Sequence, residues 1–171
     1  GLAGNPEINS EGEDFDLFCA ALFEITSKLC RMIAADGEGA TKLLECSVSG
    51  AEDEKTAKTV AKSVICSSLL KAAMFGADAN WGRVLCAIGY AYANVDVSKV
   101  GVFFRSCKGE IEVCRNGAGV DFSEESAKTS LSENEIEILV SLGNGNKSAT
   151  AWGCDLTYCL LYTSPSPRDR Q

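Results

Sequence analysis

Apolar residues near the start of the chain recur in steps of three and four, the spacing of one face of an α-helix. They are Phe15, Phe18, Leu22, Ile25, Leu29 and Ile33. One continuous stripe with this period predicts a helix over this segment. The polar stretch Asp36-Gly37-Glu38-Gly39 follows it, and its two glycines allow backbone angles that other residues resist. We therefore expect the helix to end there.

The next elements alternate between strand and helix patterns. Residues 42–48 favour a strand, and Ser49 with Glu52 has the spacing of a capping box, so a helix is expected over residues 51–66. Its inward residues would be Val60, Val64 and Ile65. After a short apolar segment at 69–75, Asn80 is suited to cap a third helix. The inner face of that helix is predicted to hold Trp81, Leu85, Ile88 and Tyr92.

The second half of the chain has the pattern of strand pairs. Residues 100–104 and 110–115 are predicted to form a hairpin around Lys108-Gly109, and Ser123 begins a short helix that ends near Leu131. Residues 135–142 alternate polar with apolar side chains, and Asn144-Gly145 favours a tight turn, so a second hairpin with 147–158 is expected. Helices and strands are interleaved, which predicts an α+β fold with helices layered on a mixed β-sheet.

Composition excludes several classes of function. The 171 residues have a formal net charge of −8, which disfavours nucleic-acid and anionic membrane partners. Histidine is absent, so Ser-His and Cys-His nucleophile pairs and His-ligated zinc are excluded from this chain. No signal peptide or membrane span is visible in the sequence. The nine cysteines include no C-x-x-C pair, so we interpret them as buried, reduced thiols in a reducing compartment.

Three segments are candidate sites. DGEGATK (36–42) lacks the spacing of a phosphate-binding loop, and a helix C-cap followed by a strand explains most of it, but Glu38 stands between two glycines where a ligand amine could approach. FGADANWGR (75–83) is interpreted as a capped helix start rather than a loop in which Asp78, Asn80 and Arg83 converge. SATAWGCDLTY (148–158) fits a buried strand. Spacing alone therefore predicts no self-contained catalytic set.

These three segments, in this order, strongly resemble the β chain of the ornithine acetyltransferase family, also called glutamate N-acetyltransferase. AGNPEI at the start, CRNGAGVDF at 114–122 and EIEI at 135–138 extend the resemblance to about residues 1–158. It implies a transferase of arginine biosynthesis that moves acetyl from N-acetylornithine to glutamate, in some members also from acetyl-CoA, with no bound cofactor or metal. The family's precursor cuts itself before a threonine that becomes the N-terminal nucleophile, and acetyl transfer runs through an acetyl-threonine.

The resemblance also implies what this chain lacks. The family's threonine lies upstream of AGNP, so no catalytic residue is expected here, and Glu38 is the substrate-binding residue that the resemblance transfers. The expected divisions are 1–48, the end of the nucleophile-bearing domain; 49–158, the C-terminal domain of the β chain; and 159–171, a disordered tail that does not resemble the family ending, which has an Asn and a hydroxyl residue. The implied partner is the α chain, in a heterotetramer or larger.

Two other interpretations stay open at this point. One is a non-enzymatic interaction domain with the same fold, and the other is a thiol-based sensor, which needs a cysteine with a lowered pKa. The expected compartment is the cytoplasm, with the mitochondrial matrix or a plastid as the alternative.

Overall fold

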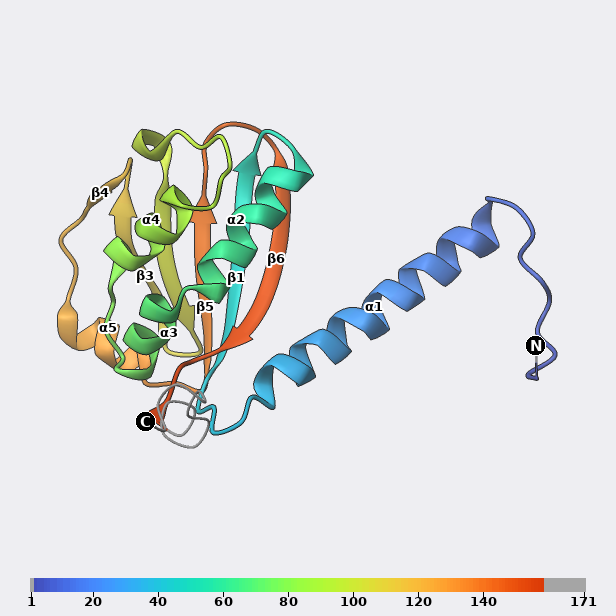
Figure 1. The fold of residues 1–171 in the computed structure, drawn as a ribbon, viewed down its shortest axis with the longest axis horizontal. Helices are drawn as coiled ribbons and strands as arrows, with labels where there is room; N and C mark the ends of the chain where they lie inside the picture. Colours follow the sequence, from blue (N-terminus) through green and yellow to red (C-terminus); the bar gives the residue numbers. More distant parts are fainter. Residues whose placement is uncertain (1, 159–171) are drawn as a thin grey trace, which may run out of the picture.

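The computed structural model describes residues 2–158, which form a six-stranded mixed sheet with helices packed against it (Figure 1). The strand order is β4-β3-β2-β5-β1-β6, and α2, α3 and α4 lie together over one face. The elements are α1 Glu13–Ala35, β1 Leu43–Ala51, α2 Glu54–Cys66, α3 Ser68–Phe75, α4 Trp81–Gly89, the 3-10 turn Val97–Lys99, β2 Gly101–Ser106, β3 Gly109–Arg115, β4 Ala118–Gly119, α5 Glu124–Leu131, β5 Glu135–Ser141 and β6 Lys147–Cys154. The fold is α+β, as predicted.

The predicted hairpin between residues 135–142 and 147–158 is wrong. β5 pairs parallel to β1, and β6 pairs antiparallel to the other edge of β1, so β1 separates the two strands. The turn residues instead bond to the end of β1, with Leu142 N donating to Ser49 O at 2.9 Å and Asn144 N to Gly50 O at 2.8 Å. The connection at 142–146 therefore crosses β1. The other predicted hairpin, β2 with β3, is confirmed.

The core forms where alternating residues of the sheet meet the inner faces of the helices. Leu44, Cys46 and Val48 of β1 are buried, and so are the residues predicted to face inward from α2, namely Val60, Val64 and Ile65. The start of α2 differs from the prediction. Ser49 belongs to β1, which continues to Ala51 because Ala51 pairs with Lys147, and Asp53 caps the helix by accepting a bond from Thr56 N at 2.6 Å.

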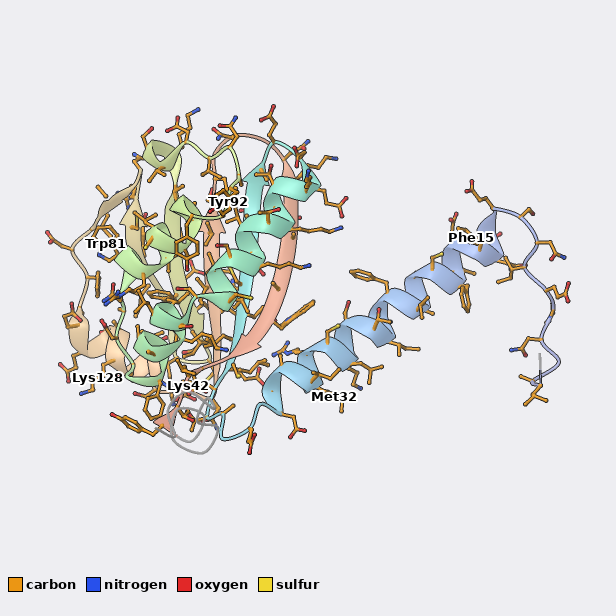
Figure 2. The ribbon with its side chains drawn as sticks, viewed as in Figure 1. Phe15, Met32, Lys42, Trp81, Tyr92 and Lys128 are labelled. Carbon is orange, nitrogen blue, oxygen red and sulfur yellow. The ribbon has the colours of Figure 1, made fainter. Side chains whose placement is uncertain are left out.

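The third predicted helix is α4, and Asn80 caps it as expected, accepting a bond from Arg83 N at 3.3 Å. Its inner face is rotated from the prediction. Val84 and Ala87 are buried together with Ile88, while Trp81 and Leu85 are half-buried. Tyr92 is fully exposed (Figure 2), because α4 ends at Gly89 and Tyr92 has a φ of 52° in the turn that follows. The apolar segment at 69–75 is a separate helix, α3.

The first helix exists as predicted, but its apolar stripe is not part of the core. α1 extends away from the sheet and meets it only near its C-terminal end, beside β1 and β6 (Figure 1). No residue of α1 is buried, and the side chains of Phe15 and Met32 stand free of the sheet (Figure 2). The helix therefore presents large apolar side chains that no other described residue covers.

The cysteine interpretation is wrong for most positions. Among residues 2–158 all eight cysteines are free thiols, and two of them, Cys46 and Cys114, are buried. Cys154 is half-buried, and the exposed ones are Cys19, Cys30, Cys66, Cys86 and Cys107. Cys30 and Cys66 line a cavity beside β6 together with Trp152, and spacing alone did not separate the exposed positions from core positions.

Two expectations stay predictions. The domain boundary expected between residues 48 and 49 falls inside β1, which is continuous from Leu43 to Ala51. The tail at 159–171 lies outside the described residues. Within the described part of the chain, no helix combines the length and apolar character needed to cross a membrane.

Candidate functional site

The DGEGATK loop joins α1 to β1, and the residues that follow β6 hold it in place. Asp155 is 3% exposed, and its carboxylate accepts bonds from Thr41 N at 2.9 Å and Lys42 N at 3.2 Å, and from the Thr41 hydroxyl. The Thr157 hydroxyl donates to Gly39 O at 2.8 Å. The bonds to Asp155 join residues 113 and 114 positions apart in the sequence, so the DGEGATK loop and the segment after β6 form one structural unit.

The glycines of the loop have distinct roles. A Cβ on Gly37 would lie 2.6 Å from Cys154 Sγ, so this close approach to β6 needs a residue without a side chain. Gly39 has a φ of 68°, the left-handed region that glycine adopts without strain. The predicted helix C-cap is present too, because Asp36 N donates to Met32 O at 3.0 Å. The loop therefore contains both the C-cap of α1 and a turn that Thr157 holds at Gly39.

Lys42 attaches the same loop to two helices. Its ammonium is buried and donates to Met74 O at 2.6 Å and to Leu131 O at 2.7 Å, near the C-terminal ends of α3 and α5. A cation there complements the negative end of each helix dipole. Burial lowers the pKa of the Lys42 amine below its ordinary value of 10.5, and the charge of Asp155 opposes that shift.

Glu38 is the exposed tip of this anchored loop. Within residues 2–158 its carboxylate forms no hydrogen bond or ion pair, whereas its neighbours on both sides are fixed by backbone contacts. A cavity of about 490 Å³ begins beside it at Gly37 and is lined mainly by apolar groups, including Ile33, Ile65 and Trp152. A free carboxylate on a fixed backbone can accept bonds from a ligand ammonium with little loss of loop entropy.

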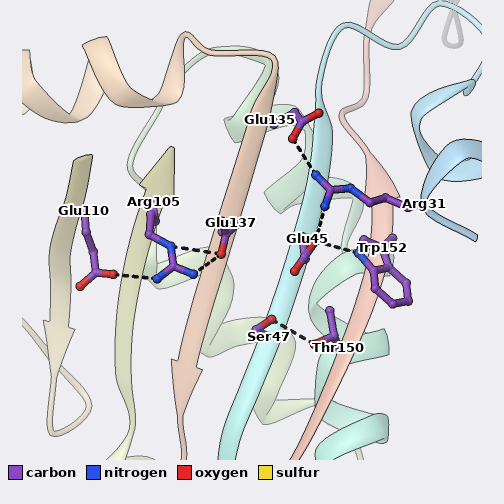
Figure 3. Close-up of polar contacts among 9 residues, drawn as sticks. All are labelled: Arg31, Glu45, Ser47, Arg105, Glu110, Glu135, Glu137, Thr150 and Trp152. Carbon is purple, nitrogen blue, oxygen red and sulfur yellow. Dashed lines mark hydrogen bonds and ion pairs between the residues drawn. The ribbon is translucent and has the colours of Figure 1, made fainter. Parts of the chain in front are cut away.

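The face of the sheet that α2 to α4 leave open is polar, and its charges are already paired (Figure 3). Arg31 of α1 bonds Glu135 at 2.6 Å and lies 3.6 Å from Glu45, which also accepts the Trp152 indole N–H at 2.8 Å. Arg105 pairs with Glu137 and, at 3.5 Å, with Glu110. A cavity of about 440 Å³ lies between the two arginines.

These ion pairs account for the positions of the Arg31 and Arg105 side chains, so neither arginine needs a catalytic role to explain its position. Hydrogen bonding to Glu137 raises the pKa of the Arg105 guanidinium, so this cation stays charged and fixed. No general base stands unpaired among the charged groups of this cavity that Figure 3 draws. The open face therefore positions α1 against the sheet, through Arg31, rather than providing a reacting group.

The second sequence segment, FGADANWGR, forms a separate unit. Asn80 Nδ2 donates to Asp78 Oδ2 at 3.0 Å, and the predicted capped helix start is confirmed. Trp81 packs on the strand made by CRNGAGVDF, where a Cβ on Gly119 would lie 2.6 Å from the Trp81 ring. The two segments therefore meet as a packing contact away from Glu38.

Sequence reasoning missed four residues of this region. SATAWGCDLTY was interpreted only as a buried strand, with no separate role for Asp155 or Thr157, and Lys42 and Arg31 were given no role, yet these four hold the loop and α1 in place. A signal was present for Asp155 and Thr157, two polar residues directly after a strand rich in small and apolar side chains. For Lys42 and Arg31 none was visible, because their partners lie 14 to 104 residues away on other elements.

Three thiols have a raised pKa, the opposite of the lowered pKa that a redox sensor needs. Burial raises the pKa of Cys46 and of Cys114, and a hydrogen bond to Glu133 raises that of Cys107. A raised pKa keeps a thiol protonated and unreactive. Among residues 2–158, no group of three or more acidic or sulfur side chains is placed to hold a metal ion.

Comparison with known proteins decides the family. The ArgJ family profile matches residues 2–162. The chain belongs to the ArgJ family. It is 51% identical to "Arginine biosynthesis bifunctional protein ArgJ 1" of Clostridium acetobutylicum over 98% of the chain and 41% of that protein. It is 50% identical to "Glutamate N-acetyltransferase" of Methanopyrus kandleri over 82% of the chain and 36% of that protein.

A solved structure of this ArgJ family has the same fold. The crystal structure of the arginine biosynthesis bifunctional protein argJ of Bacillus halodurans superposes with a TM-score of 0.85 at 40% identity, over 95% of this chain and 76% of that one. The α+β architecture is thereby the family fold. The chain spans about two fifths of the length of the curated relatives it matches.

Proposed function

We propose that this chain is the substrate-binding part of a glutamate N-acetyltransferase, the segment of the β chain that presents Glu38 to the amino-acid substrate. The observation behind it is the loop of residues 36–42, in which Asp155, Thr157 and Lys42 fix the backbone while the Glu38 carboxylate is exposed and unpaired among residues 2–158. A cationic amine, such as the side-chain ammonium of N-acetylornithine, is the complement of such a group.

The reaction proposed for the whole protein has two half-reactions. The hydroxyl of a threonine outside this chain, activated by its own α-amine, attacks the acetyl carbonyl of N-acetylornithine; the C–N bond breaks and ornithine leaves with the proton. The glutamate amine then attacks the acetyl-threonine ester, which forms N-acetylglutamate and restores the hydroxyl. Acetyl-CoA is a further acetyl donor in bifunctional members, and donors from the α chain stabilise the oxyanion.

The proposed assembly follows from this division of roles. The nucleophile and the self-cleavage step belong to the α chain and to the start of the β chain, so the partner is the α chain, in a heterotetramer or larger. The proposed compartment is the cytoplasm. The 171-residue chain by itself should transfer no acetyl group.

A chimera tests the proposal. This chain replaces the matching part of the Clostridium acetobutylicum relative, and transfer from N-acetylornithine to glutamate is measured. Glu38→Gln should lower kcat/KM by roughly tenfold to hundredfold, because a charge-assisted bond contributes about 1.5–3 kcal/mol, while self-cleavage, which needs no free substrate, stays intact. Glu52→Gln, a matched change at an exposed glutamate before α2, should leave kcat/KM unchanged.

Two results would contradict the proposal. If Glu38→Gln matched Glu52→Gln with both substrates, Glu38 would be only part of a turn. The second result is a chimera that cleaves itself correctly but transfers no acetyl group, even with the relative's own C-terminal ending. It would favour a non-enzymatic interaction domain over part of an acetyltransferase.

A further inference from the structure

Glu38 stands at the corner of a tight turn. Ala40 N donates to Gly37 O at 2.8 Å, which closes a four-residue turn with Glu38 and Gly39 as its central pair. Gly39 has a φ of 68° and Glu38 has a negative φ, the combination that defines a type II turn. Because the peptide unit between Gly39 and Ala40 closes this turn, its orientation sets the direction in which the Glu38 side chain leaves the loop.

Two hydrogen bonds hold that peptide unit, one at each end. Its N–H, from Ala40, donates to Gly37 O inside the turn, and its carbonyl, Gly39 O, accepts a bond from the Thr157 hydroxyl at 2.8 Å. The internal bond gives the turn its shape, whereas the Thr157 bond attaches the turn to a distant segment of the chain. Thr157 is thus an anchor that acts on the residue next to Glu38.

Thr157 is itself held in place by α3. Its neighbours on both sides contact that helix, since Leu156 N donates to Lys71 O at 3.2 Å and the Tyr158 ring meets the Phe75 ring edge-on, with centroids 5.5 Å apart. The contacts of this segment therefore alternate, with Thr157 bonding the turn and its neighbours contacting α3. Thr157 is also buried, so its hydroxyl has little water to bond instead. A support fixed in this way can hold the turn in one orientation.

This arrangement connects the three segments that carry the family resemblance. DGEGATK supplies the turn, SATAWGCDLTY supplies Thr157 and Tyr158, and FGADANWGR contributes its first residue, Phe75. The start of β1, the end of β6 and α3 lie at the same end of the sheet, where these contacts form (Figure 1).

We propose that Thr157 is a positioning residue for substrate binding: its hydroxyl holds the Gly39 carbonyl and thereby keeps the Glu38 carboxylate in the direction from which it binds the substrate amine. This inference rests on the proposed function of Glu38. Asp155 does not substitute for Thr157, since its bonds lie three and four residues beyond Glu38. Without the Thr157 hydroxyl the turn stays closed but can reorient, and a carboxylate that must be ordered on binding loses affinity.

The test uses the chimera with the Clostridium acetobutylicum relative, built with the relative's own ending after residue 158. Thr157→Val should raise KM for N-acetylornithine roughly threefold to tenfold, the size of one neutral hydrogen bond, with kcat within about twofold. Thr157→Ser keeps the hydroxyl and should restore KM. Thr129→Val is the matched control, because it removes an exposed hydroxyl that donates to a main-chain carbonyl, Glu125 O, at 2.9 Å, and it should change neither constant.

A double variant tells whether Thr157 acts through Glu38. Adding Thr157→Val to Glu38→Ala should lower kcat/KM by no more than about twofold beyond Glu38→Ala alone, because the carboxylate that Thr157 directs is already gone. If the two losses multiply instead, Thr157 supports the fold without positioning Glu38, and the proposal is overturned. It is also overturned if Thr157→Val matches the wild type while Glu38→Ala lowers kcat/KM.

Hydrogen–deuterium exchange in the same chimeras, read by mass spectrometry, separates a loosened turn from unfolding. Thr157→Val should speed exchange in a peptide covering residues 36–42 and leave a peptide covering 101–106 unchanged; unchanged exchange at 36–42 would overturn the proposal. If both peptides change, Thr157→Ala, which places no methyl group beside Gly39 O, replaces Thr157→Val in every measurement. Normal kinetics for Glu38→Ala would overturn the proposed function, and this inference with it.

Discussion

Removing the Asp155 carboxylate should release the DGEGATK loop, and the cost can be estimated bond by bond. Asp155→Ala deletes the acceptor for Thr41 N, Lys42 N and the Thr41 hydroxyl. Each bond to a charged group contributes about 1.5–3 kcal/mol, but Thr41 is exposed and its groups regain water, so we expect a total loss of about 3 kcal/mol. Asp155→Asn keeps the oxygen that accepts both backbone N–H groups and should cost about 1 kcal/mol.

Urea unfolding followed by circular dichroism measures both variants. The midpoint should fall for Asp155→Ala about three times as far as for Asp155→Asn, with an unchanged slope, because the surface exposed on unfolding is the same. Asp121→Ala, at an exposed aspartate between β4 and α5, serves as the control and should stay within about 0.5 kcal/mol. The reasoning fails if Asn costs as much as Ala, which would make charge the dominant factor, or if Ala costs less than 1 kcal/mol.

The remaining predictions concern Lys42, Gly119 and acetyl transfer. Lys42→Met should destabilise it by about 2–3 kcal/mol, since Leu131 O loses a buried donor. Burial lowers the pKa of Lys42 in the folded chain below 10.5, its ordinary value in the unfolded chain. Between these two pKa values the unfolded chain binds more protons, so the stability of the wild type relative to Lys42→Met should rise as the pH rises toward 10.5. Urea unfolding of both proteins over a range of pH measures this difference. Gly119→Ala should cost about 1–3 kcal/mol through overlap with Trp81, whereas Gly89→Ala, which meets no atom within 4 Å, should not, by thermal melting. The 171-residue chain alone should show no acetyl transfer in a coupled assay with N-acetylornithine and glutamate; measurable turnover would refute this. The chimera should regain full transfer only when the relative's ending replaces residues 159–171, and full activity with the present ending would count against that expectation.

Local features of the fold could be predicted from the sequence, and pairings could not. Period identified α1, and period with capping chemistry identified α4 and α5 with their N-caps Asn80 and Ser123, because the interactions that set a helix lie within four residues. The prediction of a β5–β6 hairpin was wrong because strand pairing depends on residues far apart in the sequence. Asn144-Gly145 lies in the connection between the two strands, but alternation in a strand shows which face is buried and not which strand lies beside it.

In the candidate site too, local features could be predicted from the sequence and long-range contacts could not. Glu38 is the predicted substrate-binding residue because two glycines beside it and the family resemblance both point to that position. Its anchors Asp155 and Thr157 were not assigned, since their bonds to the loop depend on β6 lying beside β1. The exposure of α1 was also beyond prediction, because an apolar stripe has the same period whether it packs in its own domain or on another molecule.

The position of β1 between β5 and β6 sets the order in which the chain can fold during synthesis. Leu43 pairs with Glu135 on one side and with Cys154 on the other, so both edges of this inner strand wait for residues made about a hundred positions later. Until then β1, whose alternate residues Leu44, Cys46 and Val48 are apolar, has two unpaired edges, and such edges favour aggregation. Contacts this distant in sequence slow folding. A ribosome that stalls before residue 135 would therefore release helices whose sheet is incomplete, and we expect such truncated products to need chaperones or to be degraded.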